Sequence, residues 1–514
     1  MPPVRREAKK KARTSPRTGK APPSVEEIRS NLDPFFKELS WEDYRGSAGL
    51  TKNVDTERIF RKYARICSAE ALRETLRAHR ASAGSGEAER RLRLLAESMT
   101  WIHVDRELAP LNDRLETEEA TGKVTIYGKK VAFRASQVML ANEVDRGRRR
   151  TIYTARLGFE EKMRPHYERK WMKAHELSRS LGYSDYREMC ERIGGFEFDG
   201  LDRIVEALLA KTARPYEEEA GEMLGAVGVG LRDAERHDVT FAFRGTAYDQ
   251  LFPAARLVPA FRETLAGLGI DLAKQKNVVL DLESRPSKVP RAACFPMDPP
   301  DKVYLIVLPQ GGYDDYESLF HEGGHAEHFA HVTKSLEVEY RHLGDNSLTE
   351  GYAALLEYVV RNPVWLENVM RLPASAYAPF LTFSHARELM MLRRYCAKFR
   401  YELKLHSGRI KEAGALYRKA LESELLFAHP EVLALSDLDS GFYAARYLRS
   451  WLLEATLRLR LIEDLGESWC LDARAGKFLR DLWAQGQRWT AEELCVEIGF
   501  PGLEAGPLLK VLEI

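Results

Sequence analysis

Residues 321–325 of this 514-residue chain read His-Glu-Gly-Gly-His, and the spacing of the two histidines predicts an α-helix. Side chains at positions i and i+4 of a helix lie on the same face, one turn apart. The imidazoles of His321 and His325 can then occupy two neighbouring positions of a tetrahedral zinc site. Glu322 is predicted to take a proton from the metal-activated water and to pass it to a leaving amine.

Two glycines stand in the middle of this predicted helix, at positions 323 and 324. Each glycine costs a helix about 0.5–1 kcal/mol relative to alanine. The cost indicates either the close approach of another backbone or a substrate, or a helix that is strained or bent at this point.

A catalytic zinc site needs a third protein ligand and leaves a fourth position for water. Glu350 is the best candidate, within a segment at 348–358 that has a helical pattern. Glu357 lies seven residues later on the same face and is predicted to hold a ligand in orientation, or to be an ordinary surface carboxylate. His328 follows His325 by three residues and is predicted to contact substrate or to support a ligand rather than to bind the metal.

The run from His321 to His328 resembles the H-E-x-G-H-x-x-H signature of the zinc peptidases related to thimet oligopeptidase and oligoendopeptidase F. In that family the third ligand is a glutamate on a following helix, 25 residues after the second histidine, and Glu350 stands at that distance from His325. The resemblance extends over about residues 290–453. It implies one zinc ion per chain, bound by two histidines and Glu350.

The family fold, by this resemblance, is a large helical ellipsoid with a deep cleft that admits short peptides. Residues 290–320 are similar to the strand and loop that precede the zinc helix in the oligoendopeptidase branch. By that analogy the backbone near Gly311 and Gly312 is predicted to line the substrate cleft, where a peptide can add to a backbone edge.

A downstream loop in the family contains a glycine and tyrosines that bond the tetrahedral oxyanion. The corresponding residues 439–451 keep the glycine and the closing tryptophan, but Phe442 and Arg449 stand where tyrosines are usual. Tyr443 and Tyr447 are the remaining candidates for oxyanion hydrogen bonds.

Arg446 or Arg449, in the same segment, is a candidate for binding a substrate carboxylate. The alternative for Arg446 and for both tyrosines is packing on an amphipathic helix.

Helical periodicity dominates the rest of the chain, beginning at the predicted cap Ser24. Residues 122–133 predict a short β-hairpin, and residues 278–312 predict two short strands joined by a proline-rich loop. The sequence therefore predicts a mainly α protein with one or two small β-sheets near the active site. We expect a disordered basic tail at 1–23, an N-terminal helical subdomain at 24–200 and a catalytic helical domain at 201–514.

Charge and cysteine usage narrow the function classes. Lys and Arg total 78 and Asp and Glu total 77, a balance that argues against dedicated nucleic-acid binding. No run approaches 18 apolar residues and the N-terminus has no apolar signal core, so no membrane span and no secretion are predicted. Six scattered cysteines without a C-x-x-C pair are typical of free thiols in a reducing compartment, so a cytoplasmic location is expected.

The favoured hypothesis is a zinc-dependent metallopeptidase that hydrolyses short oligopeptides. One alternative is a zinc hydrolase of a non-peptide amide, and another is a non-catalytic helical binding protein with a vestigial metal site. The intact Glu322 argues against the last of these, because a structural site needs no base. Internal versus terminal cleavage, residue preference and oligomeric state stay open.

Overall fold

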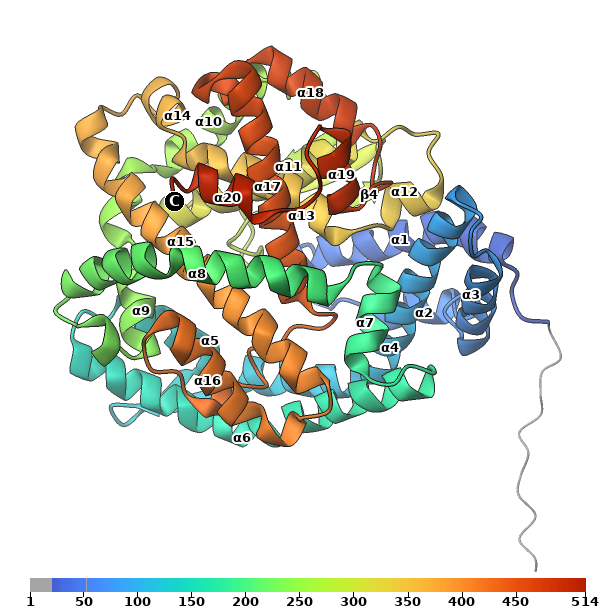
Figure 1. The fold of residues 1–514 in the computed structure, drawn as a ribbon, viewed down its shortest axis with the longest axis horizontal. Coiled ribbons are helices and arrows are strands. Elements are labelled where there is room, and N and C mark those ends of the chain that lie inside the picture. Colours follow the sequence, from blue (N-terminus) through green and yellow to red (C-terminus); the bar gives the residue numbers. More distant parts are fainter. Residues whose placement is uncertain (1–20, 52) are drawn as a thin grey trace, which may run out of the picture.

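The computed structural model describes residues 21–51 and 53–514, and within them the chain forms 20 α-helices and two small sheets (Figure 1). The mainly helical fold class expected from the sequence is confirmed. The predicted basic tail at 1–23 falls almost entirely on residues 1–20, which lie outside the described residues.

The first eight helices run from α1 to α8: α1 (Val25–Ser47), α2 (Thr56–Lys62), α3 (Ala69–Ala81), α4 (Glu87–Thr121), α5 (Phe133–Asn142), α6 (Arg146–Ser180), α7 (Tyr186–Gly194) and α8 (Phe198–Gly225). The next six are α9 (Arg236–Ala242), α10 (Ala254–Gly267), α11 (Tyr313–His331), α12 (Val338–His342), α13 (Asn346–Tyr358) and α14 (Pro363–Asn368). The last six are α15 (Ala374–His406), α16 (Ala413–Leu425), α17 (Tyr443–Leu465), α18 (Ala473–Trp483), α19 (Ala491–Glu497) and α20 (Ala505–Val511).

The first of these helices begins where the sequence predicts. The hydroxyl of Ser24 accepts the backbone N–H of Glu27, and this bond caps α1.

The smaller sheet is the β-hairpin predicted at 122–133. Strand β1 (Lys123–Ile126) pairs antiparallel with β2 (Lys129–Ala132). Its buried residues share a small apolar cluster with α5 and α6. The hairpin is therefore separate from the helix that carries the histidine pair.

The second sheet contains one strand more than the sequence predicts. Strand β3 (Val278–Asp281) runs parallel to β5 (Lys302–Ile306), and β4 (Ala293–Asp298) pairs antiparallel with β5, in the order β3-β5-β4. The prediction of two strands was wrong because Pro296 marks the segment 293–298 as loop. Proline is tolerated there because β4 is an edge strand with only one paired side.

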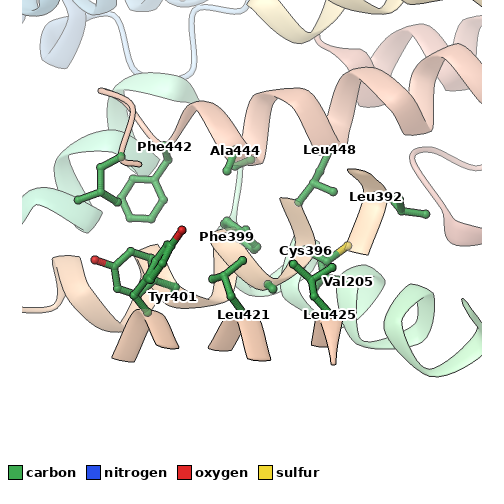
Figure 2. Packing of buried hydrophobic residues seen from close by; sticks show 14 of the residues in the cluster. Val205, Leu392, Cys396, Phe399, Tyr401, Leu421, Leu425, Phe442, Ala444 and Leu448 are labelled. Atoms are coloured by element: carbon green, nitrogen blue, oxygen red, sulfur yellow. The ribbon is translucent and has the colours of Figure 1, made fainter. Parts of the chain in front are cut away.

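A large apolar cluster joins α8, α15, α16 and α17 (Figure 2). In Figure 2 side chains of α15, such as Phe399, lie between α17 and α16, with Val205 of α8 beside them. Trp171 belongs to the same cluster, so its members come from both sides of residue 200. The division into 24–200 and 201–514 stays a prediction.

Within the described part of the chain, no helix combines the length and apolarity needed to span a bilayer.

Candidate metal centre

The helix that carries the histidine pair is α11, and it begins at a glycine. Gly312 is its N-cap with a φ of 93°, a region of backbone conformation that favours glycine. Asp315 in the first turn accepts the backbone N–H groups of Gln310 and Gly311. The chain thus turns sharply after β5, and α11 packs against the sheet.

Gly323 and Gly324 let two other elements approach α11. A Cβ at position 324 would lie 2.7 Å from the Cα of Ala353 and 2.9 Å from the carbonyl oxygen of Tyr352, both on α13. A Cβ at position 323 would overlap the ring of Phe261 on α10. Of the two explanations for these glycines, close approach of another backbone is confirmed for Gly324.

This close packing brings Glu350 of α13 to the histidine pair. Glu350 Oε2 lies 3.3 Å from His321 Nε2 and 3.8 Å from His325 Nε2, and the three ligand atoms lie within 4.8 Å of one another. In a tetrahedral zinc site with bonds of about 2.0–2.1 Å, ligand atoms lie about 3.3 Å apart. Small side-chain adjustments therefore suffice for these three residues to share one ion.

An unpaired buried oxygen supports this assignment. Glu350 Oε2 is buried and has no hydrogen-bond partner among the described residues. Such an atom costs free energy unless something satisfies it. A divalent cation between Glu350 and the two imidazoles satisfies it, so the residues fit a zinc ion.

The charges at the site also favour a cation. Burial lowers the pKa of His321, but the nearby carboxylates of Glu350 and Glu357 outweigh burial and raise it well above its usual value. Burial and the charge of His321 lower the pKa of His325 to about 4, which keeps this imidazole neutral as a metal ligand requires.

Glu357 contacts the other nitrogen of the first histidine. Its Oε2 lies 2.9 Å from His321 Nδ1. When Nε2 binds a metal, Nδ1 carries the proton and donates to this carboxylate. The contact favours the orienting role predicted for Glu357 over that of an ordinary surface carboxylate.

Glu322 faces the edge of the sheet. The backbone N–H of Cys294 on β4 donates to Glu322 Oε2 at 2.8 Å. Burial raises the pKa of Glu322, which makes the carboxylate a stronger base. The sequence analysis missed the contribution of Cys294, because it placed a loop where β4 lies.

Tyr443 of α17 contacts Glu350. Its hydroxyl donates to Glu350 Oε1 at 2.9 Å, so the two oxygens of Glu350 face different partners. The left-handed backbone of Phe442 (φ 54°) turns the chain into α17 at this residue. The ring of Tyr447 lies 4.8 Å from that of Tyr443, one turn further from the histidines.

His328 and Arg446 lie outside the group of three ligand atoms. His328 is fully buried between Phe329 and Tyr352, and burial lowers its pKa to about 3. Arg446 is buried in an ion pair with Glu97 of α4, at 2.5 Å. The roles in substrate binding predicted for both residues stay predictions.

Gly311 and Gly312 pack against a neighbouring loop. The backbone N–H of Gly312 donates to the carbonyl of Phe252, and a Cβ at Gly311 would lie 2.8 Å from the nitrogen of Ala254. This backbone is therefore engaged by the protein itself. Its place in a substrate cleft stays a prediction.

Arg449, which replaces a tyrosine of the family pattern, supports the glutamate helix. It is fully buried and binds both carboxylate oxygens of Asp345, at 2.9 and 2.6 Å. Asp345 in turn caps the N-terminus of α13, five residues before Glu350. Burial opposes ionisation of Asp345, but Arg449 holds its pKa well below the usual value.

Comparison with known proteins shows similarity of structure only. No protein-family model and no curated protein sequence matches the chain. A structure described as an oligoendopeptidase F of Bacillus anthracis strain Ames has a TM-score of 0.69 at 14% identity, covering 95% of this chain and 90% of that one. PZ peptidase A with a bound inhibitor has a TM-score of 0.66 at 15% identity, covering 95% and 91%. The fold is thus shared over nearly the full length of both peptidases.

Proposed function

We propose that this chain is a zinc-dependent peptidase that hydrolyses short peptides. One observation carries the proposal: the buried, unpaired Oε2 of Glu350 faces the Nε2 atoms of His321 and His325, with Glu322 beside them. The peptidase fold of both structural neighbours supports a peptide substrate. The cytoplasmic location remains an expectation from the sequence.

The residues around the ligand set divide the work. Zinc bound there would polarise the scissile carbonyl and favour deprotonation of water. Glu322 Oε2 accepts the N–H of Cys294, which leaves Oε1 free to take the proton of the attacking water and to hand it to the leaving amine. Glu357 keeps the Nε2 of His321 directed at the ion through the bond to Nδ1.

Tyr443 is the residue we assign to the oxyanion. Its hydroxyl donates to Glu350 Oε1, so it would stand close to a substrate oxygen that approaches a metal held by Glu350 and could donate to that oxygen instead. Burial raises the pKa of Tyr443, so the hydroxyl keeps its proton and can donate it.

Removal of the metal tests the proposal directly. We expect a library of quenched peptides of about 5–15 residues, a length that suits an extended binding cleft, to be cleaved, the cleavage to stop with a chelator, and zinc to restore it. Metal analysis should give one zinc per chain. Cleavage that is insensitive to the chelator would contradict the metal mechanism. One zinc per chain without any peptide cleavage would favour a non-peptide amide substrate or a binding protein.

Replacement of Tyr443 by phenylalanine is expected to lower kcat about 10²-fold, because it removes one oxyanion donor. Zinc content should stay near one per chain, since all three ligands remain. Tyr447→Phe is the matched comparison, because Tyr447 lies next to Tyr443 but has no hydrogen bond to Glu350 among the described contacts. Steady-state kinetics of both variants checks this, and a larger loss in Tyr447→Phe would reassign the role.

A further inference from the structure

An aromatic stripe runs along α17 away from the ligand set. Within residues 441–459, only Tyr443, Tyr447 and Trp451 are not fully buried. They are spaced four residues apart and so share one face of the helix. Tyr395 of α15 packs edge-on against Tyr447 and Trp451, at ring distances of 5.3 and 5.1 Å. Such a face on an otherwise buried helix borders open space.

The stripe ends at an open cavity of about 140 Å³ that is lined mainly by residues of α11, α13, α15, α17 and α20. Trp451 and Met391 form part of an apolar wall, and Glu357 connects the cavity to the ligand His321. One water molecule needs about 10–15 Å³ of such a cavity volume. The cavity has room for several water molecules and hence for a long side chain.

Carboxylates outnumber guanidinium groups around this cavity. Glu317, Glu357, Glu388 and Glu454 line it, against Arg361 and Arg387, with Arg458 in contact behind them. The set holds four carboxyl groups against three guanidinium groups.

One of these carboxylates is only loosely paired. Glu388 reaches Arg361 and Arg458 only at 3.8 Å, and the described contacts give it no hydrogen bond. Glu454 is 5% exposed and pairs with Arg458, with its Oε1 3.0 Å from Arg458 Nε and its Oε2 accepting from Nη2 at 3.2 Å. Burial raises the pKa of Glu454 to about 7, and a cation nearby would draw this carboxyl into its charged form.

The walls and the charges together match one kind of side chain. An aliphatic stem would pack against the Trp451 ring and the Met391 side chain. A cationic head would be stabilised by the aromatic ring and by the carboxylates. Lysine and arginine combine these two parts. An acidic side chain would instead face Glu388 and Glu454.

The distance along α17 sets the position in a substrate. Trp451 lies eight residues after Tyr443, which is about 12 Å of helix. An extended peptide advances about 3.3–3.6 Å per residue. Measured along α17, Trp451 thus lies about three extended residues from Tyr443, or two when a long side chain reaches along the stripe.

We propose that this cavity is a specificity subsite that takes a lysine or arginine side chain, two or three residues to one side of the bond that is cleaved. The inference rests on the proposed peptidase function.

A positional scan tests the subsite in the full-length, zinc-loaded protein. One lysine is moved through an otherwise neutral quenched peptide, and each peptide is compared with its norleucine counterpart. We expect one position, two or three residues from the cleaved bond, at which lysine raises kcat/KM about tenfold over norleucine, as a charge-assisted contact supplies. Glutamate at that position should be the poorest substrate.

Two cavity variants and a matched control complete the test. Glu388→Gln should reduce the lysine-to-norleucine ratio to about 2, since it removes one charge, and Met391→Lys should do the same by placing a tethered cation in the cavity. Glu367→Gln, on an exposed glutamate of α14 outside the cavity, should keep the wild-type ratio.

Two outcomes overturn the inference in distinguishable ways. Cleavage of the library with no position that favours lysine, or a ratio unchanged in both cavity variants, overturns the subsite and leaves the peptidase function standing. Failure to cleave any peptide overturns the function and the subsite together.

Discussion

Glu322→Gln is expected to lower kcat/KM for peptide hydrolysis by about 10²–10⁴, the contribution of a positioned general base. Glutamine has nearly the size of glutamate, and its carbonyl oxygen can still accept the N–H of Cys294. It cannot take a proton from water. The variant should therefore fold, bind one zinc per chain and fail in catalysis.

Zinc content, thermal unfolding and steady-state kinetics of the same preparation check this expectation. Glu327→Gln is a matched control, because Glu327 lies on the same helix, is buried and accepts a bond from Gln275. Burial raises the pKa of Glu327 to about 7, so glutamine resembles its neutral form and catalysis should change little. Wild-type hydrolysis by Glu322→Gln would rule out this carboxylate as the base.

The local part of the site could be predicted from the sequence. The spacing of His321 and His325 follows from helix geometry alone, and the structure places both on α11. Glu350 was assigned by its distance from His325 in a family pattern, and α13 brings it to both imidazoles. The paired strands of the hairpin at 122–133 also followed from alternation within a few residues.

The contacts that join distant segments could not be predicted in the same way. Pro296 hid the edge strand β4, and with it the N–H of Cys294 that holds Glu322. The sequence gives no sign that Arg446 pairs with Glu97, 349 residues earlier in the chain. Nothing in local periodicity reports such partners, because they depend on how α4 and α17 pack.

Valine at position 324 is expected to lower the free energy of unfolding by about 1–3 kcal/mol, the usual range for overpacking a core. The atoms that its Cβ would meet, 2.7 and 2.9 Å away, belong to the backbone of α13 rather than to a flexible side chain. Chemical denaturation of the metal-free protein measures this loss. Gly221→Ala is the opposite case, because nothing lies within 4 Å of its Cβ in α8. It should stabilise the protein by about 0.5–1 kcal/mol through helix propensity.

The same substitution should weaken zinc binding, and this second effect separates packing at the site from packing in general. Relief of the overlap at Gly324 requires α13 to move away from α11, and α13 carries Glu350 while α11 carries both histidines. At Gly351 a Cβ would lie 2.8 Å from the end of the Leu453 side chain on α17, which can move aside, so a substitution there presses α13 from its other side and less severely. For each kcal/mol of stability that is lost, Gly324→Val should therefore lose more zinc affinity than Gly351→Val does. Competition with a chelator under native conditions measures both affinities. Equal zinc affinity in Gly324→Val and wild type would mean that the ligand set does not depend on the contact between α11 and α13.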